Sequence, residues 1–146
     1  MSASRDRDEL GRAQQARPRD RLGRPLPYGS VGVEPVDDRE LSPTATLQTA
    51  WQLVGEGRAF AAHEVFEAQW KRCPTQERDL WQGLAQLCVA LTHAERGNHP
   101  GAASLLTRAT ERLNGYARTG GPTHGVDLEQ VVQGVRERIS TLAPPT

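Results

Sequence analysis

The stretch FAAHEVFEAQWKR, residues Phe60 to Arg72, says most about the fold of this chain. On a helical wheel of about 100° per residue, one face collects Phe60, His63, Phe66, Glu67 and Trp70. We expect that face to be buried, although it carries an imidazole and a carboxylate spaced i, i+4. Buried polar groups need partners. This helix is therefore predicted to meet other polar side chains inside the fold.

Size and charge limit the classes of protein that remain. The chain has 146 residues, with 18 basic and 18 acidic side chains, so we expect one small domain without a net field for nucleic acid or a membrane surface. No apolar signal segment opens the chain, and no run approaches the roughly 18 apolar residues that span a bilayer. Two cysteines do not make a disulfide framework. We expect a cytoplasmic protein with no membrane partner.

Residues 1–41 are rich in proline and poor in large apolar side chains, and they are predicted to form an extended or disordered arm. Its segment ARPRDRLGRPLPYGS sets basic residues beside apolar ones, so it could lie over a folded surface or stay a mobile arm. The candidate contact residues are Arg17, Arg19, Arg21, Arg24 and Tyr28. These arginines also suggest nucleic-acid binding as an alternative function, which the balanced charge disfavours.

Helical periodicity continues through the rest of the chain. Cap residues mark the predicted helix starts: Ser42 before Pro43, Thr75, Asn98 and Asp127. The predicted divisions are a helical core domain at 42–116, a loop at 117–126 and a C-terminal helix at 127–142. No segment reads as a strand, so the sequence predicts an all-α antiparallel bundle of about five helices. The apolar stripe of the last helix could complete the core or form a homodimer.

The predicted helix at 76–96 has two different faces. The broad apolar face consists of Leu80, Leu84, Leu87, Cys88 and Leu91. A narrower opposite stripe consists of Gln82, Gln86, Val89 and His93. Solvated helical faces usually carry Lys, Glu or Arg, whereas this stripe carries uncharged amides and an imidazole. We therefore expect it to face a partly buried polar pocket.

Adjacent antiparallel helices lie about 8–10 Å apart, so the polar stripes of the second and third helices can meet. The predicted polar cleft consists of His63, Glu64, Glu67, Gln82, Gln86 and His93. Three interpretations stay open: a structural hydrogen-bond network, a small-ligand pocket, and a metal site. No cofactor is predicted by a motif, and a divalent metal is considered only because His63, Glu67 and His93 could ligate one.

Catalytic alternatives rest on short matches. The pentad HEVFE at 63–67 resembles the HExxH of zinc peptidases, but Glu67 stands where a second imidazole is required. A metal-dependent hydrolase would use Glu64 as its base. Cys88 lies in the apolar stripe and is expected to be an inert core residue. Cys73 ends a helix, where the dipole raises the pKa of a thiol, so neither cysteine is a good nucleophile.

Several motifs in order along the chain resemble one family. They are FAAHEVFE at 60–67 with Trp70, WQGLAQL at 81–87 with His93, and the pairs Gly97-Asn98 and Gly101-Ala102. Together they resemble domain-of-unknown-function family 309, small all-helical proteins of bacteria and archaea, over about residues 42–116. The resemblance implies helical hairpins loosely similar to tetratricopeptide units, and it implies no established activity.

The sequence therefore favours a non-enzymatic binding or interaction module with a polar cleft between its second and third helices. Its partner would be an unknown small ligand or a protein segment, with the arginine arm closing over the cleft. The alternatives are the metal-dependent hydrolase and nucleic-acid binding through the arm.

Overall fold

The computed structural model describes residues 6–7, 13–14 and 40–142. Within these residues the chain forms five α-helices, which are α1 (Pro43–Gly55), α2 (Ala59–Arg72), α3 (Arg78–Glu95), α4 (His99–Thr119) and α5 (Leu128–Leu142). A 3₁₀ turn, η1 (Thr75–Glu77), leads into α3. The predicted all-α fold is confirmed. The tetratricopeptide likeness stays an expectation.

Two short strands lie in the segment that was predicted to be an extended or disordered arm. β1 (Asp6–Arg7) pairs antiparallel with β2 (Ala13–Gln14), with Asp6 opposite Gln14 and Arg7 opposite Ala13. No strand was predicted there. The predicted arm contacts, Arg17, Arg19, Arg21, Arg24 and Tyr28, lie outside the described residues.

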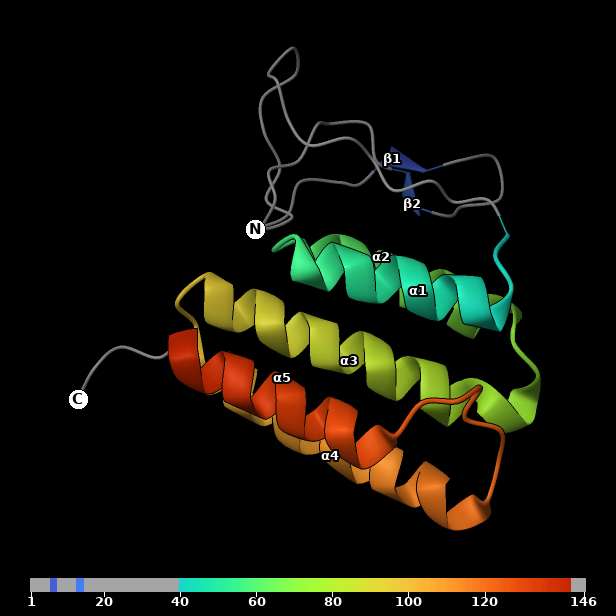
Figure 1. The fold of residues 1–146 in the computed structure, drawn as a ribbon. Helices are drawn as coiled ribbons and strands as arrows, with labels where there is room; N and C mark the ends of the chain where they lie inside the picture. The colour runs from blue at the N-terminus through green and yellow to red at the C-terminus, as the bar shows by residue number, and fades with distance from the viewer. Residues whose placement is uncertain (1–5, 8–12, 15–39, 143–146) are drawn as a thin grey trace.

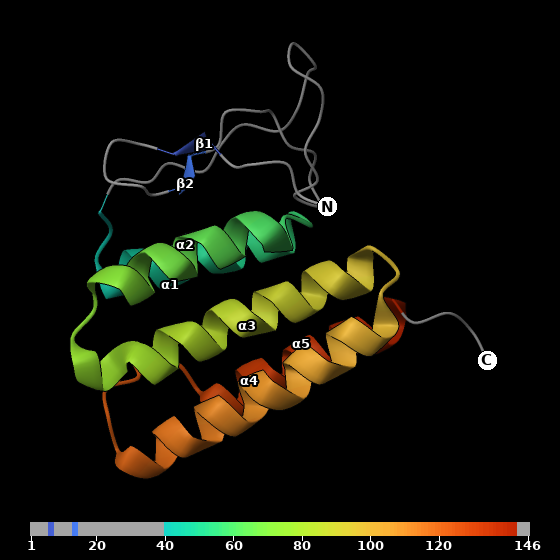
Figure 2. The same ribbon diagram turned by 180° about the vertical axis from the view of Figure 1, so that it is seen from behind.

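The helices are arranged around α3, with α1 and α2 on one side of it and α4 and α5 on the other (Figure 1). The pairs α2 with α3 and α3 with α4 pack closely, and α1 packs on α2. α1 and α5 run in the same direction on the front face of Figure 1, whereas α2 and α4 form the opposite face in Figure 2. α1 and α5 therefore flank α3 on one face of the bundle.

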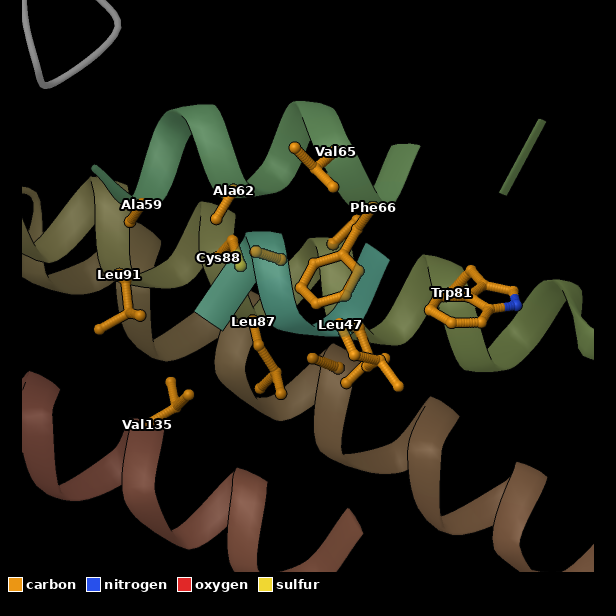
Figure 3. Packing of buried hydrophobic residues seen from close by; sticks show 14 of the residues in the cluster. Leu47, Ala59, Ala62, Val65, Phe66, Trp81, Leu87, Cys88, Leu91 and Val135 are labelled. Atoms are coloured by element: carbon orange, nitrogen blue, oxygen red, sulfur yellow. The ribbon is translucent and has the colours of Figure 1, made fainter. Parts of the chain in front are cut away.

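The centre of the core is aromatic and comes from three helices. Phe66 of α2 and Trp81 of α3 are fully buried, with ring centroids 6.2 Å apart, and Trp51 of α1 meets Phe66 edge-on at 5.3 Å. Figure 3 shows Leu47, Leu87 and Cys88 in the same layer of packing. The predicted apolar face of α3 is confirmed, because its four leucines and Cys88 are all buried. Such contiguous burial is the main source of stability for a bundle of this size.

Local capping explains most helix starts. Ser42 Oγ accepts from Ala45 N at 3.1 Å, Asn98 Oδ1 from Gly101 N at 3.0 Å, and Asp127 Oδ1 from Gln130 N at 3.1 Å, as predicted. The predicted Thr75 cap is wrong. The chain makes the η1 turn instead, with Glu77 N donating to Pro74 O at 2.9 Å, and α3 begins without a side-chain cap.

The last helix completes the core. Leu128, Val132 and Val135 of α5 are buried in the same cluster as the leucines of α3. α4 runs to Thr119 and so includes the first three residues of the predicted loop at 117–126, and Gly120 follows it at φ 71 as a left-handed cap. Within residues 40–142, no helix combines the length and apolarity that crossing a bilayer requires.

Candidate functional site

The histidine and glutamate of α2 form a pair at the edge of the helix. His63 Nε2 lies 3.0 Å from Glu67 Oε2, and Lys71 Nζ lies 3.4 Å from Glu67 Oε1. The hydrogen bond from His63, together with the charges of His63 and Lys71, outweighs partial burial and lowers the pKa of Glu67 from 4.5 to about 2. Glu67 is therefore an anion across the physiological range.

The face of α2 that packs into the core is not the predicted one. Its buried residues are Ala59, Ala61, Ala62, Val65, Phe66 and Gln69. Of the five residues predicted to share the buried face, only Phe66 is buried. Alanines allow the backbones of α2 and α3 to approach closely, so the larger side chains such as His63 and Trp70 lie at the margin. Glu64 is also half-buried on this helix.

The polar residues of α3 make their contacts elsewhere. Arg112 of α4 donates from Nε to Gln86 Oε1 at 3.1 Å and from Nη1 to Asp79 Oδ1 at 2.7 Å. Asn98 Nδ2 donates to His93 Nδ1 at 3.1 Å. Gln82 is half-buried. These contacts join α3 to α4 and to the connection that follows α3.

The residues of the predicted cleft thus make two separate sets of hydrogen bonds, one on α2 and one on α3. Over residues 40–142, no hydrogen bond or ion pair joins the His63–Glu67 pair to Gln82, Gln86 or His93. The same part of the chain holds no group of three His, Cys, Asp or Glu side chains placed to bind a metal, so the predicted set of His63, Glu67 and His93 does not form one. A shared cleft for ligand binding stays a prediction.

A second polar cluster lies where the α2–α3 and α4–α5 connections meet. Glu77, only 7% exposed, accepts at Oε1 from Trp81 Nε1 at 3.2 Å and from His124 Nε2 at 2.7 Å. Because an ionised carboxylate can only accept, Nε2 carries the proton and Nδ1 of a neutral ring is the acceptor. The Trp81 and His124 rings lie 5.6 Å apart, tilted by 30°. We call Cys73, Glu77, Trp81, Tyr116 and His124 the Glu77 cluster.

The charge of Glu77 reaches the other members of this cluster. Burial, and then the charge of Glu77, raise the pKa of Tyr116, whose hydroxyl donates to Pro122 O at 2.6 Å. Burial and Glu77 also raise the pKa of Cys73, although Arg78 opposes them. Burial raises the pKa of the Cys88 thiol as well. These directions agree with the prediction that neither cysteine is a good nucleophile.

A groove opens beside this cluster, between α1 and the start of α5. It has a volume of about 510 Å³. Its lining residues are Thr44, Leu47, Gln48, Trp51, His124, Gly125, Val126, Asp127, Gln130 and Val131. We call it the α1–α5 groove. His124 belongs to both features, since the residue lines the groove and its Nε2 is held by the buried carboxylate.

Sequence reasoning missed both partners of this contact. Glu77 was not among the predicted site residues, and His124 fell within the predicted loop at 117–126. They are 47 positions apart, so no local periodicity connects them. The one local signal is Gly125, because glycine marks turns and loops.

Part of the chain matches a known protein family. Residues 47–105 match the family described as Domain of unknown function (DUF309). The predicted DUF309 resemblance is confirmed. The DUF309 segment runs from the first turns of α1 into α4, and it includes His63, Glu67 and Glu77 but ends before His124.

One curated relative is similar to this chain. It is the "Uncharacterized protein YpuF" of Bacillus subtilis (strain 168), 38% identical over 88 residues, which are 58% of this chain and 50% of that protein. The chain therefore spans about half the length of this relative. No solved structure matches the chain. Neither the DUF309 description nor the name of the relative assigns a ligand or a reaction.

Proposed function

We propose that this protein is a non-enzymatic binding module whose ligand occupies the α1–α5 groove beside His124. The observation that carries the proposal is the position of His124: a buried carboxylate holds one nitrogen of its imidazole, and the residue itself lines a groove of about 510 Å³. Ligand sites are typically concave, mainly apolar, and equipped with a few well-placed polar groups, within about 300–1,000 Å³.

The walls of the groove fit this description. Leu47 and Trp51 of α1 face Val126 and Val131 across it. Trp51 is braced by its edge-on contact with Phe66 at 5.3 Å, so its indole is held in place before a ligand arrives. The polar lining groups include Gln48, Asp127 and Gln130 near the rim. We infer a ligand of small-molecule size, with an apolar body and one polar group that hydrogen-bonds to His124.

Filling the groove from its rim tests the proposal without disturbing the core. Gln48 is exposed and lines the groove, whereas Gln52 is exposed one turn further along α1 and does not line it. The probe is 1-anilinonaphthalene-8-sulfonate, followed by its fluorescence. Gln48→Trp is expected to weaken probe binding about tenfold, equivalent to about 1.4 kcal/mol, and Gln52→Trp to leave it unchanged. Equal affinities in the two variants would contradict a ligand site in this groove.

A second candidate is the polar cleft between α2 and α3. The observation in its favour is His63 Nδ1, which is buried without a hydrogen-bond partner while Nε2 is held by Glu67. A buried nitrogen of this kind is satisfied when a ligand or protein segment supplies a donor.

This second site is tested with His63→Ala and Glu67→Gln. If the cleft binds a ligand or partner, these variants lose partner capture and ligand-induced melting shifts that the unaltered protein shows. Unchanged stability, capture and melting shifts in both variants would remove the candidate.

A further inference from the structure

The backbone at His124 has a conformation that its side chain type rarely adopts. His124 lies at φ 52, in the left-handed region, and Gly125 follows at φ 86. A non-glycine residue in this region costs free energy and persists where its surroundings hold it. Here the holding contacts are the 2.7 Å bond to Glu77 and the Trp81 ring. The imidazole of His124 therefore fastens the α4–α5 connection to Glu77 of η1 and Trp81 of α3.

We propose that His124 and Glu77 form a proton-responsive latch that controls which ligands the α1–α5 groove accepts. The inference rests on the proposed function, because it concerns the regulation of that same groove. An imidazole is the side chain that ordinarily changes its charge between about pH 5 and 8. In this proposal the imidazole is neutral at alkaline pH. On acidification it gains a proton, and the two side chains form a carboxylate–imidazolium pair.

Protonation changes both ends of the ring. At Nε2 the contact with Glu77 becomes charge-assisted, and such hydrogen bonds are about twice as strong as neutral ones. At Nδ1, the other ring nitrogen, a lone pair that can accept a hydrogen bond is replaced by an N–H that donates. The groove is thus expected to favour a donor head group at alkaline pH and an acceptor or anionic head group at acidic pH, while the connection is held more firmly.

Other titratable and charged groups lie near this pair. The charge of Glu77 acts on Cys73 and on Tyr116 of α4, and Arg78 at the start of α3 acts on Cys73. Asp127 lies on the same connection as His124 and lines the groove. The α1 wall contributes no charged side chain to the groove lining. Glu77 is the one of these groups in direct contact with the ring, so the response is assigned to this pair.

The first experiment measures binding of 1-anilinonaphthalene-8-sulfonate at about pH 6 and pH 8. This probe has an apolar body and an anionic sulfonate. The unaltered protein is expected to bind it about tenfold more tightly at the lower pH. His124→Gln keeps a donor for Glu77 but does not titrate, so its affinity should be the same at both pH values. His99→Gln, which removes a different half-buried histidine at the start of α4, should retain the full response.

The second experiment reads the latch without a ligand. Hydrogen exchange of the amides at 120–127 should slow severalfold between pH 8 and pH 6, after correction for the intrinsic rate, in the unaltered protein. The slowing should be absent in Glu77→Gln and in His124→Asn, whose side chain tolerates the left-handed backbone.

The outcomes separate the two proposals. A pH response of probe binding that survives in His124→Gln overturns the latch while leaving the groove as the ligand site. Probe binding that is insensitive to Gln48→Trp overturns the groove function, and the exchange measurement then still supports or overturns the latch by itself.

Discussion

Among the groups that are not fully buried, Glu67 has the most clearly altered ionisation. Its pKa falls to about 2, mainly through the hydrogen bond from His63. A carboxyl group with a lowered pKa in the fold stabilises the protein above its ordinary value of 4.5, and this stabilisation is lost as the pH falls towards 2. Because the side chain of Glu67 is 44% exposed, solvent screening keeps the effect small.

Glu67→Gln should therefore flatten the acid limb of the stability profile. Between about pH 4.5 and 2 the Tm of the unaltered protein should fall more steeply, by up to about 4 °C, since an exposed pair contributes at most about 1 kcal/mol. Differential scanning calorimetry across this range measures it, with exposed Glu111→Gln as the control that keeps the original slope. A parallel profile for Glu67→Gln would show that the His63 contact does not persist in solution.

Unlike Glu67, Glu77 is buried, and its carboxylate accepts two hydrogen bonds. Glu77→Ala leaves the Trp81 and His124 donors without their acceptor, and it should reduce the free energy of unfolding by about 1–3 kcal/mol. Exposed Glu129→Ala, in the first turn of α5, should change it by about 0.5 kcal/mol or less. Urea denaturation followed by circular dichroism makes the comparison, and similar losses in both variants would contradict a stabilising role for the Glu77 cluster.

Helix packing at the level of elements depends on a close approach of α3 to α4. Gly83 lies in this interface, where an added Cβ would be 2.6 Å from Leu113 Cδ2 and 2.7 Å from its Cγ. The glycine is required by this contact and not by its backbone angles. Arg112, which joins α4 to Gln86 and Asp79 at 3.1 and 2.7 Å, adds a polar clasp to the same interface.

Gly83→Ala should therefore destabilise the protein by about 1–3 kcal/mol, because Leu113 must move in a filled core. Gly134→Ala is the matched substitution on α5, where nothing lies within 4 Å of the new Cβ. It should stabilise by about 0.4–1 kcal/mol through helix propensity and a less flexible unfolded chain. The Tm values of the two variants should thus shift in opposite directions, and a neutral Gly83→Ala would refute the tight α3–α4 contact.

Local signals predicted the helices well and their neighbours poorly. The caps at Ser42, Asn98 and Asp127 are hydrogen bonds between residues three positions apart, so they can be predicted directly from the sequence. Thr75 has the same chemistry, yet the chain turns tightly and Glu77 points inward to Trp81 and His124. Two starts of α3 are compatible with the local sequence, and a tertiary contact decided between them.

The whole molecule depends on α5 to close its core. Leu128, Val132 and Val135 are buried against α3 and α4, and Arg138 Nη2 donates to Val54 O of α1 at 3.1 Å. This hydrogen bond ties α5 to α1, the two helices that line the groove. We expect α5 to fold with the other helices as one cooperative unit.

Val135→Asp should destabilise the whole cooperative unit, because an unpaired carboxylate in the core costs several kcal/mol. The whole domain is expected to lose stability, with circular dichroism and tryptophan fluorescence showing coincident transitions at lower urea. Exposed Gln133→Asp on the same helix should stay within about 0.5 kcal/mol of the unaltered protein. Retention of the α1–α4 signals after α5 has unfolded would mean that α5 is peripheral.

By itself the sequence determined the all-α class, the apolar face of α3, three of the helix caps and the DUF309 resemblance, because each depends on residue types at short spacing. It also named His63 and Glu67, which do meet, since i, i+4 neighbours on a helix always can. It did not place the polar residues of α3, which pair with Arg112 and Asn98. Only the tertiary structure brought His124 to Glu77, because packing four helices around α3 joins two connections far apart in the chain.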